Sequence, residues 1–205
     1  LGITTYLPAV PSLCVGPADI TVMEMVSAYN TFPSRGVNIS PMMVTRIEDN
    51  NGNVLGNFAP RKRESSSEAT AYLMVNLMQG VVNEGTAGRL KWKYGMSGEV
   101  AGKTGTTNDQ SDGWFIGYTP KLTAGAWVGA EDRQVHFESL ALGGGSNMAL
   151  PIWGLFMQKV IKDGTLGITH DDKFLSPPGL VLNLNCDGSD ADATASASHS
   201  DEMFF

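Results

Sequence analysis

Apolar residues recur at helical spacing near the start of the chain. We predict an amphipathic helix from Val22 to about Phe32, because its apolar residues share one face. These residues are Val22, Met25, Val26 and Tyr29. Thr21 and Glu24 have the spacing of a capping box, in which each side chain accepts a hydrogen bond from the other residue's backbone N–H. We expect this helix to serve as scaffold.

A second stretch with the helical period predicts a helix at about 67–83. Ser65 or Ser67 would cap its start, and it would stop at Gly85, with Glu84–Gly88 as the breaker. We expect its apolar stripe to face the core, with the methionines acting as flexible core filler. This stripe consists of Leu73, Leu77 and Val81, with Met74, Met78 and Val82 beside them.

A third helix is predicted at about 148–162, capped by Ser146 or Asn147. Its expected buried stripe consists of Ile152, Leu155, Phe156 and Val160. The glycines at 143–145 precede it. A run of glycines can bind phosphate, but a loop that returns the helix to the sheet is the more common arrangement, and we favour the loop.

The remaining periodic stretches predict strands. Met43–Glu48 and Asn53–Phe58 flank Asn51-Gly52, the strongest short hairpin signal. Three later strands joined by short turns predict an antiparallel meander, with a last short strand at Leu180–Cys186. The meander strands are 100–106, 113–118 and 122–129. The fold class is therefore α+β: an antiparallel sheet flanked by helices, with 100–106 as its central strand.

Composition supports a globular domain with an acidic end. The 205 residues are 42% hydrophobic and 17% charged, which suits one domain with a substantial core. Five of the negative charges behind the net charge of −7 fall in the last nineteen residues. We expect a domain at 1–186 and a disordered Ser/Ala/Asp-rich tail at 187–205. The rest is nearly neutral and has no basic patch for nucleic acid.

Other features of the chain suggest a fragment. No apolar run is long enough to cross a bilayer, and residues 1–4 resemble the interior of a domain. Cys14 and Cys186 allow at most one disulfide, and we expect two separate buried residues instead. His136, His170 and His199 are scattered, and we expect them to be surface residues.

The chemistry of the chain is concentrated in the strand that carries Lys103. An ammonium beside threonine hydroxyls can hold a carboxylate, because charge-assisted hydrogen bonds are strong. Gly105 lets a ligand approach the backbone closely. Lys103 and Thr104 point to opposite faces of a strand, so both can serve one ligand only if the strand has a free edge. We therefore interpret this stretch as a peptide-binding edge strand with a carboxylate anchor. Thr106 and Thr107 extend the run of hydroxyls.

Two other interpretations of this strand are possible from its residues. Gly-Lys-Thr also ends the phosphate-binding P-loop, but Gly98 lies one residue too close and no helix start follows Thr107. An ordinary strand that ends in a polar turn is the second alternative. The residues of the strand alone do not exclude it.

Several motifs together resemble the C-terminal half of the transpeptidase domain of class A, bifunctional penicillin-binding proteins. The resemblance covers roughly residues 1–186 in one colinear order. It rests on Lys103–Asp109, Gly113–Pro120, Ala126–Gly129, Thr21–Tyr29, Ala149–Trp153 and Pro177–Gly179. It implies the penicillin-binding-protein and β-lactamase-like α+β fold.

The chain departs from that family's pattern at the nucleophile. The family carries a nucleophilic serine in S-x-x-K and a second serine in S-x-N. No serine here has lysine at +3 or asparagine at +2; Ser146 and Asn147 are adjacent. The resemblance therefore implies that this chain provides one wall of an active site and is inactive alone.

The resemblance also implies roles for the residues of this strand. Lys103 would orient the S-x-N serine and bring positive charge, and the Thr106 N–H would form half of an oxyanion hole. The hydroxyls of Thr104 and Thr106 would hold the substrate carboxylate, with Gly105 and Thr107 completing the binding segment. Trp114, Tyr118 and Trp127 would be packing residues. No cofactor or metal is implied.

The implied reaction is peptidoglycan cross-linking for the cell wall, through a serine acyl-enzyme. The implied partners are stem peptides that end in D-Ala-D-Ala, β-lactam antibiotics and the N-terminal remainder of the chain, with no nucleic acid. The implied location is the periplasmic face of the cytoplasmic membrane, with an anchor outside this chain. The alternative is a non-catalytic sensor of penicillin or peptidoglycan with the same fold. The sequence preceding Leu1 would distinguish them.

Overall fold

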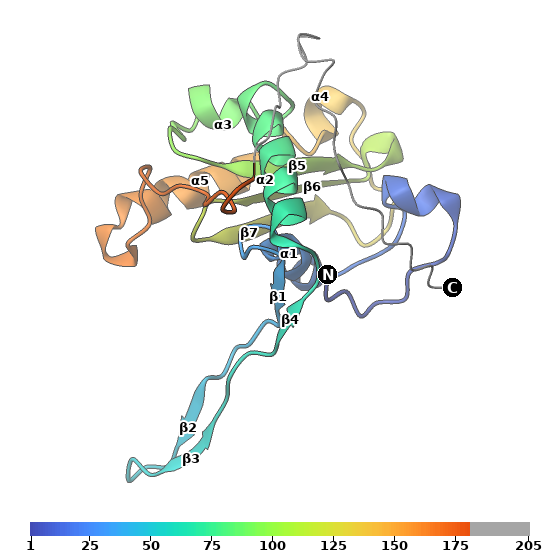
Figure 1. Ribbon diagram of the computed structural model, residues 1–205. Helices are drawn as coiled ribbons and strands as arrows, with labels where there is room; N and C mark the ends of the chain where they lie inside the picture. Colours follow the sequence, from blue (N-terminus) through green and yellow to red (C-terminus); the bar gives the residue numbers. More distant parts are fainter. Residues whose placement is uncertain (181–205) are drawn as a thin grey trace, which may run out of the picture.

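The computed structural model describes residues 1–180 (Figure 1). Its helices are η1 (Pro11–Val15), α1 (Val22–Asn30), α2 (Glu68–Asn83), α3 (Arg89–Trp92), η2 (Asn108–Gln110), α4 (Leu140–Gly143), α5 (Ala149–Lys162) and η3 (Gly164–Leu166). Its strands are β1 (Val37–Ile39), β2 (Arg46–Glu48), β3 (Val54–Asn57), β4 (Lys62–Glu64), β5 (Ala101–Thr106), β6 (Asp112–Tyr118) and β7 (Thr123–Gly129). The α+β class is confirmed.

The main sheet is an antiparallel meander in the order β5-β6-β7. Lys103 lies opposite Ile116, and Thr106 lies opposite Gly113. The prediction that 100–106 is the central strand was wrong, because β6 is central and β5 is at an edge. The burial of the strands agrees with this order: β6 is almost wholly buried, whereas β5 carries exposed Lys103 and Thr106.

Helices cover both faces of this sheet (Figure 1). On one face α5 packs against β6 and β7, in a core that includes Phe115, Trp153 and Met157. On the other face α2 packs against β5, and its Val75 and Met78 contact Ala101 and Tyr118. α1 lies on this second face, against β7. The sheet is thus the middle of three layers, with the edge at β5.

The buried stripe of α5 differs from the predicted one. Ile152, Leu155 and Phe156 are exposed. The buried residues are Ala149, Leu150, Trp153, Gly154, Met157 and Val160. Apolar residues occur on several sides of this helix, so the period alone allowed two stripes. The stripe that contains Trp153 packs against the sheet. The Trp153 indole N–H donates to Gly117 O at 3.2 Å and to Ala124 O at 3.1 Å.

The stripe of α2 was also only partly predicted. Met78 and Val82 are buried as expected, and the other buried residues are Ala71 and Val75. Leu77 is exposed.

Trp127 is 40% exposed, so its predicted role as a packing residue holds only for part of its ring, which lies beside Trp114.

The local signals at the helix starts had mixed outcomes. The capping box of Thr21 and Glu24 is present, and Ser67 caps α2 by accepting from the Thr70 N–H. The predicted cap of α5 was wrong, since its N-cap is Met148 without a side-chain hydrogen bond.

Cys14 is exposed, contrary to the expected burial. The strand predicted at Leu180–Cys186 lies, apart from Leu180, outside the described residues, as does the 187–205 tail.

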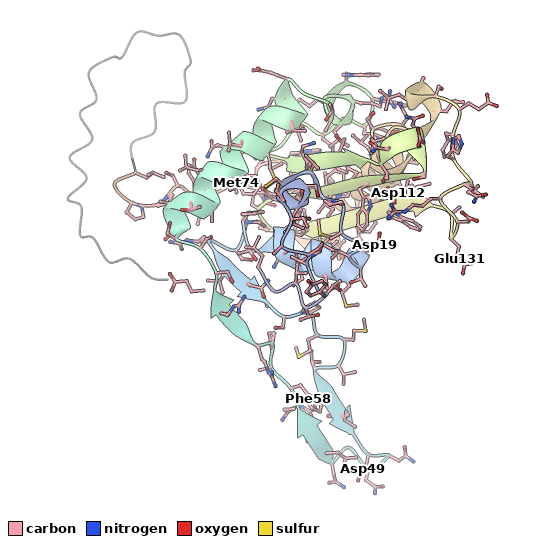
Figure 2. All side chains as sticks on the ribbon, turned by 90° about the vertical axis from the view of Figure 1, so that its right-hand side faces the viewer. Asp19, Asp49, Phe58, Met74, Asp112 and Glu131 are labelled. Atoms are coloured by element: carbon pink, nitrogen blue, oxygen red, sulfur yellow. The ribbon has the colours of Figure 1, made fainter. Side chains whose placement is uncertain are left out.

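A long two-stranded ribbon, here called the arm, projects from the body (Figure 1). The predicted hairpin is present as β2 and β3, with Phe58 and Asp49 along its length (Figure 2). β1 and β4 form the base of the arm, where Val37 lies opposite Glu64. The sequence pattern predicts no strand at either position. β1 and β4 are three residues long, which is too short for an alternation of apolar and polar residues to be recognised in the sequence.

Candidate functional site

β5 is paired on one side only within residues 1–180, to β6. The Thr107 N–H donates to Asp112 O at 3.2 Å, which extends the ladder by one residue. Alternate residues of an antiparallel strand direct their backbone groups to opposite sides. The N–H and C=O groups of Lys103 and Gly105 therefore point to β6, and those of Thr104 and Thr106 point to the free edge.

The Lys103 side chain bends back to this free edge. Its Nζ donates to Thr104 O at 2.9 Å, and the side chain is exposed. Among the residues that the structure describes, no carboxylate lies within ion-pairing distance of this ammonium. Its positive charge is therefore available at the edge where the Thr104 carbonyl is directed.

The hydroxyls of Thr104 and Thr106 lie on one face of β5, two residues apart. That face is the α5 face, because Thr104 is opposite Phe115. The Oγ1 atoms of Thr104 and Thr86 are 2.8 Å apart. Thr106 Oγ1 accepts a hydrogen bond from the Gly145 N–H at 3.0 Å. Each hydroxyl is thus held by a segment outside the sheet.

Gly105 and Thr107 have different surroundings. Gly105 is half-buried opposite Trp114, and an added Cβ would come within 3.1 Å of the Trp114 Cβ. Thr107 closes the turn into β6, where its hydroxyl donates to the Asp112 carboxylate. Asp112 lies at this end of the sheet (Figure 2). The Thr107 hydroxyl is therefore already engaged within the turn.

The glycines at 143–145 are buried against this end of the sheet. A Cβ at Gly145 would stand 2.2 Å from Gly105 O and 2.6 Å from Trp114 O. Only glycine allows the backbone to approach so closely. The loop that returns the chain to the sheet is confirmed, and its contact with β5 is what brings the Gly145 N–H to Thr106.

Two surface clefts lie away from β5. One of about 270 Å³ lies between α2 and residues 172–175, and one of about 510 Å³ lies in the arm, along residues 40–47 and 58–61. None of the five residues Lys103–Thr107 lines either cleft. In residues 1–180 no cluster of three metal-binding side chains occurs, and no helix has the length and hydropathy needed to cross a membrane.

Comparison with known families places this chain in one of them. The model of the penicillin binding protein transpeptidase domain matches residues 9–134, more than half of the chain. The chain belongs to this family. The matched range includes β5 and therefore the segment that carries Lys103, Thr104, Thr106 and Thr107.

Individual relatives agree with this assignment. Penicillin-binding protein 1A of Aquifex aeolicus is 34% identical over 174 residues, which cover 85% of this chain and 23% of the relative. Penicillin-binding protein 1A of Neisseria meningitidis is 30% identical, over 88% of this chain and 24% of the relative. The chain therefore spans about a quarter of the length of these relatives and is part of a class A penicillin-binding-protein transpeptidase domain.

Solved structures show the same fold. Penicillin-binding protein 1A from Haemophilus influenzae superposes with a TM-score of 0.71 at 23% identity, over 83% of this chain and 30% of that one. The PonA1 protein from Mycobacterium tuberculosis, solved in complex with penicillin V, gives 0.65 at 25% identity, over 86% of this chain and 50% of that one. The penicillin-binding-protein fold of the described residues is thus independently supported.

Sequence reasoning located β5 but missed the residues that contact it. Gly85 to Gly88 was interpreted only as a helix terminator, yet Thr86 lies against Thr104. Gly145 was interpreted only as part of a loop, yet it donates to Thr106. These contacts join residues 18 and 39 positions apart, so no local pattern announces them.

Proposed function

We propose that this chain forms one wall of the active site of a serine-type peptidoglycan D,D-transpeptidase. The observation that carries the proposal is the free edge of β5. The Lys103 ammonium lies at that edge, 2.9 Å from Thr104 O, and the Thr106 backbone N–H is directed to the same side. An edge strand can pair with an extended peptide through its main chain, and the cation and hydroxyls can bind the peptide's carboxylate.

The proposed reaction proceeds through an acyl-enzyme. A serine from a part of the parent protein outside this chain attacks the carbonyl carbon of the penultimate D-Ala of a stem peptide. The peptide bond breaks, and the terminal D-Ala leaves with its amine protonated. The amine of a neighbouring stem peptide then attacks the ester, so a cross-link forms and the serine is released. β-Lactams would acylate the same serine.

In this scheme the catalytic residues of the chain are Lys103 and Thr106. The Lys103 ammonium would orient the second serine of the family pattern and stabilise negative charge in the cleft. The Thr106 N–H would donate to the developing oxyanion, a contact whose loss typically costs about 3 to 4 kcal/mol in the transition state. Its position on a sheet edge keeps this donor rigid.

The proposed binding residues surround these two. The hydroxyls of Thr104 and Thr106 share one face of β5, so both could donate to one terminal carboxylate. Gly105 between them allows the close approach of Trp114 and of the glycine loop that carries Gly145. The hydroxyl of Thr107 is bonded to Asp112, so any contact with substrate would come from the Thr107 backbone or require that bond to exchange.

The proposal can be tested on the full-length protein that carries this chain. We expect a fluorescent penicillin to label it covalently, and a pentapeptide ending in D-Ala-D-Ala to release D-Ala when an amine acceptor is present. Labelling without release of D-Ala would support a penicillin sensor and overturn the transpeptidase assignment. This chain alone should gain no mass from a β-lactam, because none of its serines has a lysine at +3.

The location is proposed on the same grounds. Class A penicillin-binding proteins in general act at the outer face of the cytoplasmic membrane. We propose that this chain works on the periplasmic side, anchored through a segment outside it. To test this orientation, protease is added to spheroplasts and to sealed inverted membrane vesicles, whose cytoplasmic face is outside. We expect the full-length protein to be cleaved in spheroplasts and to resist cleavage of this domain in the inverted vesicles.

A further inference from the structure

Two segments from outside the sheet meet the same face of β5. One is the loop after α2, which carries Thr86, and the other is the glycine loop before α5, which carries Gly145. Arg89 joins them, because its Nη1 donates to Ser146 O at 3.1 Å. We call these three residues, Thr86, Arg89 and Gly145, the bracket. The bracket touches the two threonine hydroxyls and contributes none of the residues to which the proposed function assigns a role.

The Gly145 N–H restricts the directions that the Thr106 hydroxyl hydrogen can take. A hydroxyl has one hydrogen to donate and two lone pairs that accept. Gly145 N–H occupies one lone pair of Thr106 Oγ1 at 3.0 Å. The hydroxyl hydrogen therefore points away from the Gly145 N–H and can be donated to another acceptor. Thr106 therefore has its hydrogen available for an anion, while one of its two accepting positions is already filled.

Thr86 acts in the same way on Thr104. With the two Oγ1 atoms 2.8 Å apart, either hydroxyl can be the donor. An anion that accepts from Thr104 makes Thr86 the donor to Thr104, since Thr104 has only one hydrogen. Hydrogen bonds in such a chain polarise and strengthen one another. A ligand without negative charge gains less from this arrangement.

We propose that the bracket positions the Thr104 and Thr106 hydroxyls as paired donors and so makes the site selective for a free carboxylate. Thr86 is then a positioning residue for specificity, which acts through Thr104. This inference rests on the proposed function and deepens it. The carboxylate contact itself belongs to the proposed function, and the new element is the role assigned to residues outside β5.

The test compares two ligands on the full-length protein. One is a penicillin with its free carboxylate, and the other is the methyl ester of the same penicillin. The variants are Thr86→Val, which keeps the shape of the side chain but removes the hydroxyl, and Thr86→Ser, which keeps the hydroxyl. Acylation rate constants are measured with both ligands, and a melting temperature is measured for each variant.

We expect Thr86→Val to slow acylation by the free acid about two- to tenfold, the range for loss of one neutral hydrogen bond. Acylation by the ester should change less than twofold, and Thr86→Ser should retain the wild-type ratio between acid and ester. An equal loss with both ligands, or no loss with either, would overturn the inference. If wild-type protein is not acylated at all, the proposed function itself fails and the inference with it.

Discussion

Gly145 and Gly105 are in backbone contact: a methyl group on Gly145 would stand 2.2 Å from the carbonyl oxygen of Gly105. We expect Gly145→Ala to push the loop away from β5 and to lower the free energy of unfolding by about 1 to 3 kcal/mol, the usual range for overpacking. It should also lengthen the Gly145–Thr106 hydrogen bond. Denaturant unfolding measures the first effect.

Gly80 provides the matched control for that substitution. It is an exposed position inside α2 where an added Cβ has no atom within 4 Å. Alanine is favoured over glycine in a helix interior by roughly 0.5 to 1 kcal/mol, so Gly80→Ala should stabilise the protein. Equal effects of the two substitutions would contradict the steric explanation.

Lys103→Ala should impair acylation without impairing the fold. The side chain is exposed and its only hydrogen bond within the described residues is to Thr104 O. Loss of a charge-assisted hydrogen bond is worth roughly 1.5 to 3 kcal/mol, which corresponds to a fall of about tenfold to a few hundredfold in the acylation rate. The melting temperature should change little. Acylation at the wild-type rate would mean that β5 is scaffold only.

Two tryptophans should differ sharply in their effect on stability. Trp153 is 1% exposed and donates to carbonyls of β6 and β7, so Trp153→Ala should cost about 3 to 5 kcal/mol. Trp127 is 40% exposed, and Trp127→Ala should cost clearly less. Urea unfolding of both variants ranks them. A larger loss for Trp127 would contradict the layer arrangement described above.

Stability should fall in acid partly because of Glu24. Its carboxylate accepts from the N–H and O–H groups of both Thr4 and Thr5, and these bonds hold its pKa well below the ordinary 4.5. Because the folded-state pKa is depressed, the stabilisation is fully present above pH 4.5 and is lost as the pH falls below that value. Glu24→Gln should therefore unfold more easily at pH 7 and depend less on pH below 4.5.

The control for this pH effect is Glu131→Gln. Glu131 lies on the exposed loop after β7, away from α1 (Figure 2). This substitution should leave the acid unfolding curve unchanged. Unfolding midpoints measured from pH 7 down to about 3 compare the two variants. Identical curves for wild type and Glu24→Gln would show that the capping carboxylate contributes nothing to acid sensitivity.

The elements that could be predicted from the sequence are those whose cause is local. Thr21 and Glu24 are three residues apart, and Asn51-Gly52 is itself the turn, so each signal lies within its own segment. Strand order could have been predicted too. A meander pairs each strand with its neighbours in sequence, so the pattern itself places 113–118 between the other two strands, and the prediction that 100–106 is central did not follow from it.

The candidate site divides along the same line. Lys103 and the threonines of β5 could be selected because their chemistry is contiguous in the sequence. Thr86 and Gly145 could not, because a threonine in a helix-ending loop and a glycine in a glycine run have ordinary local explanations. Only the fold brings them to the hydroxyls of β5.

The arm has a consequence for how this chain can vary in length. Its tip is joined to the body only through the ribbon, and a side chain at Gly52 would meet no atom within 4 Å. Residues added in pairs on both sides of the Asn51-Gly52 turn would lengthen the ribbon and keep each side chain on its face. The reach of the arm and the geometry of β5 can therefore change independently of each other.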